Sequence, residues 1–200
     1  MIKKIFFVFS VALVLQLVAG CVDCNCGPIK KIYYTKKNLS LKHMDATLPH
    51  PMIAKDSVIA SDKYGIYLQM QTQQLTVRKQ YTNWGLIQIA QACSCAEDEF
   101  IPTEQISAIA IFSNNDFDAG HPKNTDLSLY FKVKRGKTVQ TIEYYLNSLK
   151  DSRYLSNNPF AEGIFLQVAP NSNNKHRFRF KITLSDGRIL EAETTEVELI

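Results

Sequence analysis

Residues 177–190 are the most informative stretch of the sequence for the fold. They read Arg177-Phe178-Arg179-Phe180-Lys181-Ile182-Thr183-Leu184-Ser185-Asp186-Gly187-Arg188-Ile189-Leu190. Polar and apolar residues alternate up to Leu184, which is typical of a strand with one buried face and one solvated face. The Asp186-Gly187 pair then indicates a turn, and residues 189–197 return as the second strand of a hairpin.

Two registers of this hairpin can be compared. A two-residue loop would place Glu191 opposite Ile182 and bury a carboxylate among apolar side chains. A three-residue loop over residues 185–187, with its glycine left-handed, pairs Ile182 with Leu190 and sets Lys181 against Glu191 on the wet face. We therefore predict the three-residue loop.

The same period of two recurs along the chain, in Ile32 and Tyr34; Leu39, Leu41 and His43; Ile66, Leu68 and Met70; Ile87 and Ile89; Leu127, Leu129, Phe131 and Val133; and Ile164, Leu166 and Val168. Residues 106–112 are apolar at nearly every position, which predicts a central strand covered on both faces. A helical spacing joins Val139, Ile142, Tyr145, Leu146 and Leu149, and it predicts a three-turn amphipathic helix after Thr138.

Many short strands and one helix predict an all-β fold, namely an Ig-like β-sandwich with one short amphipathic helix in a crossover. A small β-barrel is the alternative. No internal repeat or long linker divides residues 29–200, so we expect them to form a single β-sandwich domain.

The N-terminus indicates export. Lys3 and Lys4 precede an apolar run of about 14 residues, and the segment Leu17-Val18-Ala19-Gly20-Cys21 ends it. This segment resembles the lipobox of bacterial lipoproteins. We expect residues 1–20 to be a signal peptide, Cys21 to carry the lipid, and residues 21–28 to be a lipidated tether that attaches the protein to the membrane.

Charge argues against nucleic acid as a partner. Once Lys3 and Lys4 leave with the signal peptide, Lys+Arg falls from 23 to 21 against 19 acidic residues, a net charge of +2. Nucleic-acid binding requires a strongly basic surface, and this balance provides none.

Four further cysteines form two Cys-x-Cys pairs, Cys24 with Cys26 and Cys93 with Cys95. Export to an oxidising compartment favours disulfides, cross-linked between the pairs in either of two connectivities. Free thiols and a four-thiolate metal site are the alternatives, although zinc sites usually have two to four residues between paired cysteines. We expect no cofactor and no resident metal.

Motifs for catalysis are lacking. The sequence holds no Gly-x-Ser-x-Gly elbow, no His-Glu-x-x-His helix and no phosphate-binding glycine loop.

The candidate metal ligands are weak. The four histidines show no ligand spacing and are interpreted as surface residues: His43, His50, His121 and His176. Residues 114–120 resemble part of a calcium loop that Asp126 would close, but an Asx-rich connection explains them equally well.

Two surface patterns are candidate binding sites. Arg177, Arg179, Lys181 and Arg188 would form a cationic ladder for an acidic glycan, although glutamates on the facing strand favour a simple solvated face. Six aromatic residues would form a sugar-stacking platform: Tyr33, Tyr34, Tyr64, Tyr67, Tyr81 and Trp84. Trp84 and Tyr81, in a turn-like setting, are the weak ligand-binding candidates.

A family resemblance rests on residues 92–102, which read Ala92-Cys93-Ser94-Cys95-Ala96-Glu97-Asp98-Glu99-Phe100-Ile101-Pro102, and on the strand and turn motifs at 106–111, 115–118 and 127–131. Together they resemble small lipoproteins of about 200 residues from Bacteroides and its relatives, classed as a domain of unknown function. The resemblance implies an outer-membrane location. An acidic run after Cys21, which favours display on the cell surface, is lacking, so the periplasmic face is favoured.

These observations predict a lipid-anchored, non-catalytic binding or scaffold module whose partner is an envelope protein or a glycan. One alternative is an envelope hydrolase that uses Asp116, Asp118 or the acids at 97–99. Another is a metal or redox role for the cysteine pairs.

Overall fold

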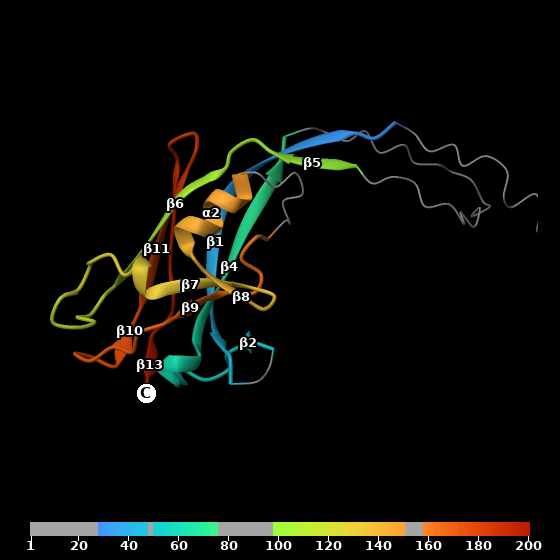
Figure 1. Cartoon of the computed structure of the whole chain (residues 1–200). Helices are drawn as coiled ribbons and strands as arrows, with labels where there is room; N and C mark the ends of the chain where they lie inside the picture. The colour runs from blue at the N-terminus through green and yellow to red at the C-terminus, as the bar shows by residue number, and fades with distance from the viewer. Residues whose placement is uncertain (1–27, 48–49, 76–97, 151–157) are drawn as a thin grey trace, which may run out of the picture. The chain divides into compact units, whose positions relative to one another are not determined.

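The computed structural model describes residues 28–47, 50–75, 98–150 and 158–200 (Figure 1). Contacts divide the chain into two units, and the larger one combines Tyr34–Gln73 with Pro102–Ile200. In the described part of the smaller unit, the Leu75 N–H donates to the Tyr33 carbonyl and the Glu99 N–H to the Lys30 carbonyl. All sites discussed below lie in the larger unit.

The elements of the described residues are, in chain order, β1 (Lys31–Asp45), β2 (Met52–Ile53), β3 (Val58–Ile59), η1 (Ser61–Lys63), β4 (Tyr64–Gln74), β5 (Glu99–Pro102), β6 (Ile106–Ser113), η2 (Ser128–Tyr130), β7 (Phe131–Arg135), β8 (Thr138–Thr141), α2 (Ile142–Lys150), β9 (Ile164–Leu166), β10 (Lys175–His176), β11 (Phe178–Leu184), β12 (Ile189–Glu193) and β13 (Val197–Leu199).

The strands form three sheets. The largest has the order β2-β1-β4-β9-β7-β8, with β5 paired to β1, and the two smaller sheets have the orders β10-β13-β3 and β12-β11-β6. Figure 1 shows β7 and β9 running across the direction of β1 and β4, so the large sheet curls. Since β8 and β9 both pair antiparallel with β7, α2 lies in a crossover between two mutually parallel strands.

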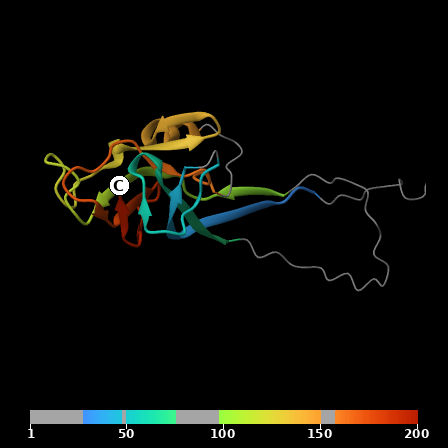
Figure 2. The ribbon, with the colours of Figure 1, turned by 90° about the horizontal axis from the view of Figure 1, so that it is seen from below.

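One hydrophobic core joins the three sheets. Its fully buried members include Ile66 and Leu68 of β4 and Phe180 of β11, and Leu146 of α2 is 5% exposed. The helix packs against β6, β7 and β8, and Figure 2 shows it (orange) lying over the yellow β7 and β8. Sheet-on-sheet burial of apolar side chains therefore holds the fold together. The all-β fold with one short helix in a crossover is confirmed.

The register of the β11–β12 hairpin is confirmed. Ile182 pairs with Leu190, and Lys181 pairs with Glu191, as a three-residue loop requires. Gly187 has φ +84°, the left-handed conformation expected of it. The polar-out register was predictable because the alternative would have buried glutamates.

The helix begins later than the spacing of apolar residues predicts. Residues 138–141 form β8 against β7, and Val139 is 54% exposed instead of lying on the buried helix face. The helix starts at Ile142, where the Thr141 hydroxyl accepts the N–H of Tyr144 at 3.3 Å. A threonine at the N-cap position therefore marks the start, three residues after the one predicted.

Two strand predictions need correction. Leu129 was expected to lie on the buried face of a strand, but η2 interrupts that strand and leaves Leu129 90% exposed. The strand over 106–112 was expected to be central, yet among the described strands β6 pairs only with β11 and ends its sheet. The apolar pattern there includes two alanines, whose small side chains do not have to be buried. Ala108 is exposed and Ala110 is half-buried.

Several predictions concern residues outside those described. These are the signal peptide over 1–20, the lipidation site Cys21, the cysteines Cys24, Cys26, Cys93 and Cys95, and the aromatic candidates Tyr81 and Trp84. Among the helices of the described residues, none has the length and apolar character needed to cross a bilayer.

Candidate functional site

His176 is buried, so its interpretation as a surface residue is wrong. Its Nε2 lies 2.6 Å from the Asn173 carbonyl, which can only accept, so Nε2 carries the proton. The other nitrogen, Nδ1, then accepts from the Ser113 hydroxyl at 2.8 Å. Burial lowers the pKa of His176, and the hydrogen bond to Asn173 offsets this only in part.

A serine hydroxyl bonded to a histidine can act as a nucleophile with its base, but this pair is sealed off. Ser113 and His176 are 3% and 0% exposed. The rings of Phe117 and Phe178 pack against the imidazole, with centroids 5.4 and 5.5 Å away. The pair therefore joins β6 to β10 as an internal hydrogen bond.

His43 also differs from a surface histidine. Its Nδ1 lies 3.0 Å from the hydroxyl of Tyr64, which is fully buried, and its Nε2 lies 3.0 Å from the Thr195 hydroxyl. Burial lowers the pKa of His43 and raises the pKa of Tyr64 well above its usual value. The three side chains connect β1, β4 and the segment before β13.

The aspartates of the calcium-loop segment accept backbone N–H groups, and the contacts of Asp118 and Asp126 are Asx turns. Asp116 accepts the N–H of Lys123 at 2.8 Å, and Asp118 accepts the N–H of Gly120 at 2.8 Å. Asp126 accepts the N–H of Ser128 at 2.8 Å instead of closing a metal site. In the described ranges, no group of three or more His, Cys, Asp or Glu side chains is placed to hold a metal ion.

Asp118 is the centre of a partly exposed side-chain network with His121 and Tyr130. Its Oδ1 lies 2.8 Å from Nδ1 of His121, and its Oδ2 accepts from the Tyr130 hydroxyl at 3.0 Å. The hydrogen bond from His121 lowers the pKa of Asp118 despite partial desolvation, with help from the Gly120 N–H and from Tyr130. These contacts keep Asp118 ionised, which suits a structural hydrogen-bond acceptor better than a general acid.

Glu104, in the connection from β5 to β6, is the most deeply buried carboxylate of the described residues, and no sequence motif marks it. Its side chain is 2% exposed, and its Oε1 accepts from the Thr35 hydroxyl at 3.0 Å and from Arg188 at 3.1 Å. The Lys36 N–H and the Thr103 hydroxyl donate to the same carboxylate. Burial raises the pKa of Glu104, but these hydrogen bonds outweigh it and bring the pKa below its usual value.

Arg188 belongs to this cluster and not to a cationic ladder. Its Nη1 donates to the Lys36 carbonyl at 2.9 Å, and its Nε donates to Asp186 at 2.7 Å. Arg177 lies 3.8 Å from Glu196, and Arg179 lies over the ring of Phe112 at 5.2 Å. The predicted ladder is therefore dispersed among separate partners, as the solvated-face interpretation expects.

The aromatic platform does not assemble from its described members. Tyr34 is 6% exposed and Tyr64 is fully buried, so neither ring can stack on a sugar. Tyr67 accepts a hydrogen bond from Asn158 at 3.0 Å. The alternation of side chains along each strand places the rings of Tyr34 and Tyr64 in the core. A count of aromatic residues does not distinguish rings in the core from a cluster on the surface.

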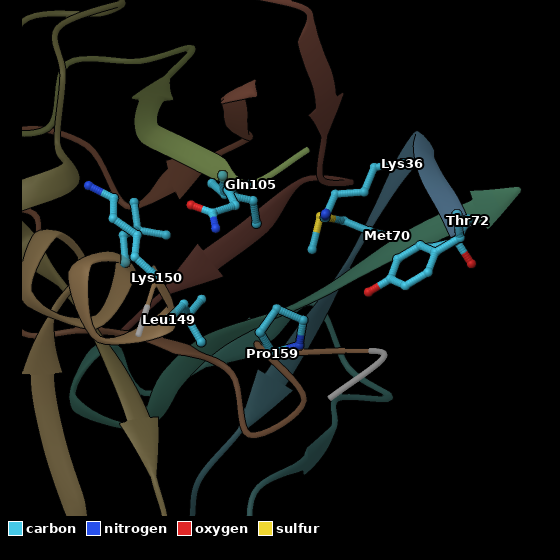
Figure 3. Close-up of a pocket in the computed structure, with 10 residues that line it drawn as sticks. Lys36, Met70, Thr72, Gln105, Leu149, Lys150 and Pro159 are labelled. Carbon is cyan, nitrogen blue, oxygen red and sulfur yellow. The ribbon is translucent and has the colours of Figure 1, made fainter. Parts of the chain in front are cut away.

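A small pocket lies where β1, β4 and α2 meet (Figure 3). It has a volume of about 30 Å³ and is lined by Tyr34, Lys36, Met70, Thr72, Gln105, Ile106, Leu146, Leu149, Lys150 and Pro159. The Lys36 ammonium donates to the Glu104 carbonyl at 2.6 Å. This volume fits about one water molecule, whereas ligand sites usually have about 300–1,000 Å³. The pocket is therefore too small for an organic cofactor.

A larger groove runs between β6 and α2. It has a volume of about 500 Å³, within the range usual for ligand sites. It is lined by Ser107, Ala108 and Ile109 of β6; Ser128, Leu129 and Phe131; and Thr141, Ile142, Glu143, Leu146, Asn147 and Lys150. We call this feature the β6–α2 groove. It combines polar and apolar groups beside a strand that ends its sheet, and nothing in the sequence patterns singled it out.

The comparisons with known proteins agree with one part of the predicted resemblance. Residues 36–195 match the family described as a domain of unknown function (DUF5034). No curated protein matches the chain, and no solved structure matches it. The match spans nearly all of the larger unit, including both walls of the β6–α2 groove. The chain therefore belongs to the DUF5034 family of domains of unknown function.

Proposed function

We propose that the protein is a lipoprotein of the Bacteroides type, anchored through Cys21 in the outer membrane with its domain facing the periplasm, and that it serves as a non-catalytic binding module. The N-terminal charge, the apolar run and the Leu17–Cys21 segment support the anchor. Two or more acyl chains on one cysteine provide stable attachment, at about 0.8 kcal/mol per buried CH₂.

One contrast supports the binding role. The β6–α2 groove has a volume large enough for a ligand, whereas the side chains that could act in catalysis are already engaged in hydrogen bonds within the protein. Ser113, His176 and Glu104 are buried and engaged in internal hydrogen bonds. Asp116 and Asp118 accept backbone N–H groups at 2.8 Å. Groups used in this way stabilise a fold, and the open groove remains for recognition. The partner we propose is an envelope protein or a glycan.

The anchor is tested by Cys21→Ser in the full chain expressed in a Bacteroides host. We expect wild-type protein to sediment with membranes and to carry acyl mass at Cys21, while the variant loses both. A variant that is trimmed identically and still sediments without acyl mass would contradict the anchor.

The binding role is tested by two measurements on wild-type protein in detergent, namely a pull-down from solubilised envelopes and a glycan array. We expect a reproducible partner in at least one. Hydrolysis of envelope polysaccharides that disappears in Asp116→Asn would instead show an enzyme and overturn the proposal.

A further inference from the structure

We infer that the β6–α2 groove binds an extended peptide segment of a partner protein, which adds a strand to the free edge of β6. The inference rests on the proposed binding role and deepens it, because it names the site and the class of partner. Its support comes from the backbone of β6, from the neighbouring segment of this chain, and from the charges on α2.

Among the described residues, part of the β6 backbone beside the groove has no strand partner. The Ile111 carbonyl accepts the N–H of Leu127 at 2.7 Å, and the Ser113 carbonyl accepts the N–H of Asn124 at 2.8 Å, so both residues turn their polar groups away from β11. Backbone groups alternate in direction along an antiparallel strand, which makes Ile109 face the same way. Within the described residues, no group bonds to the Ile109 N–H or carbonyl at this edge.

The chain itself shows how such an edge is filled. Asp126 forms an antiparallel bridge with Phe112, and Leu127 continues along β6 as far as Ile111. At Ser128 the chain turns into η2 and leaves the edge, and the groove begins there. An antiparallel peptide that continues the line of residues 126–127 would therefore meet Ile109 next, because strand addition repeats the same ladder.

The residues that line the groove favour a peptide in which apolar and polar side chains alternate. Phe131 and Leu146 are buried apolar residues on the core side, while Leu129 stands at the mouth and is 90% exposed. Successive side chains of a strand point to opposite faces, so a bound peptide would direct alternate apolar side chains inward and polar ones to solvent. A glycan provides neither the ladder hydrogen bonds nor this alternation.

Charges on α2 give the peptide a direction. Glu143 and Lys150 line the groove seven residues apart on α2, about 10 Å along its axis. Lys150 also lines the small pocket with Gln105 and Ile106, which places it near the beginning of β6 (Figure 3). An antiparallel peptide would end near Lys150, so we expect a basic residue near Glu143 and, roughly three residues later, an acidic one near Lys150.

The test uses the full chain in detergent micelles and phage-displayed random dodecapeptides as the probe. Selected peptides are synthesised, their affinities are measured by fluorescence polarisation, and amide hydrogen exchange is recorded with and without peptide. We expect an alternating peptide that slows exchange at the Ile109 amide. Failure to select any peptide, or protection confined to other amides, would overturn the inference.

Three variants sharpen the result. Ile109→Pro removes the outward N–H and should weaken binding about tenfold, whereas Ile109→Ala removes more of the side chain but keeps the N–H and should bind within about threefold of wild type. Leu129→Asp, at an exposed position that leaves the core intact, should also weaken binding about tenfold. Equal losses for the proline and alanine variants, with Leu129→Asp unchanged, would contradict strand addition.

Other outcomes separate the inference from the proposed function. A positive glycan array with no selected peptide would overturn strand addition and leave the binding role standing. A dimer whose Ile109 amide is protected without peptide would show that a second copy of the chain fills the edge, and it would overturn the partner we infer.

Discussion

The carboxylate of Glu104 is stabilised by contacts that outweigh the cost of its burial. At 2% exposure it would favour the neutral form, yet Thr35, Thr103, the Lys36 N–H and Arg188 all donate to it. Lys36 belongs to the same cluster, and burial lowers its pKa while the charge of Glu104 partly restores it. With Asp186, which pairs with Arg188, the two acidic and two basic side chains balance in charge, and the cluster links β1, the β5–β6 connection and the β11–β12 turn.

Replacing Glu104 with glutamine should destabilise the fold by about 2 kcal/mol. The substitution keeps the shape but leaves Lys36 and Arg188 without their shared carboxylate, and because the Arg188 side chain is 40% exposed, solvent offsets part of the usual cost. Urea unfolding of the full chain in detergent measures the change. Glu191→Gln, on an exposed strand position, is the control and should change stability by less than about 0.5 kcal/mol. Equal effects of the two substitutions would contradict the role assigned to Glu104.

The buried histidines predict acid sensitivity. Burial lowers the pKa of both His176 and His43, while in the unfolded chain each titrates near 6.5. Below this value the unfolded state binds more protons than the folded one, so stability is complete above about pH 6.5 and falls as the pH decreases, by up to about 1.4 kcal/mol per pH unit for each histidine.

Unfolding free energies between pH 7.5 and 5 measure this dependence. His176→Gln should reduce its slope, because it removes one of the two buried imidazoles. A wild-type slope of zero across this range would show that the two buried rings do not resist protonation.

At the scale of elements, the β11–β12 hairpin is where sequence and structure agree most closely. Apolar alternation, the Asp186-Gly187 turn and the charge pairing of Lys181 with Glu191 all favour one register. Asp186 reinforces the turn, because its Oδ1 accepts the N–H of Arg188 at 3.0 Å. Local signals that agree with one another determine a hairpin without help from distant residues.

Gly187→Ala should destabilise the protein by about 1 kcal/mol. Its φ of +84° is unfavourable for a residue with a Cβ, although no atom lies within 4 Å of the position that a Cβ would take. The cost is therefore conformational. Gly187→Asn should be less destabilising, since asparagine adopts left-handed conformations more readily. Thermal unfolding of the three proteins should rank them glycine, asparagine, alanine, and a more stable alanine variant would refute a left-handed turn.

At the scale of the whole molecule, the predicted cysteine pairing would join two segments that are far apart in the chain. If Cys24 and Cys26 are cross-linked to Cys93 and Cys95, each bridge closes a loop of about 70 residues and the first contributes roughly 4 kcal/mol. Peptide mapping of unreduced full chain should then recover fragments that join the two Cys-x-Cys pairs. Reduction should lower the urea midpoint. Four titratable thiols in the protein purified without reductant would rule out the bridges.

The sequence alone determined the all-β class, the crossover helix and the hairpin register, because periodicity and turn chemistry act between near neighbours. The predicted helix start was too early, because the residues before Ile142 form the short strand β8. Leu129 was predicted to lie on a buried strand face, but the 3₁₀ turn η2 interrupts the strand there. The Glu104 cluster, the histidine pairs and the free edge of β6 were decided only by tertiary structure. Their partners are far apart in the chain, 63 residues for Ser113 with His176, 68 for Lys36 with Glu104 and 152 for His43 with Thr195, so only the packing of sheets brings them together.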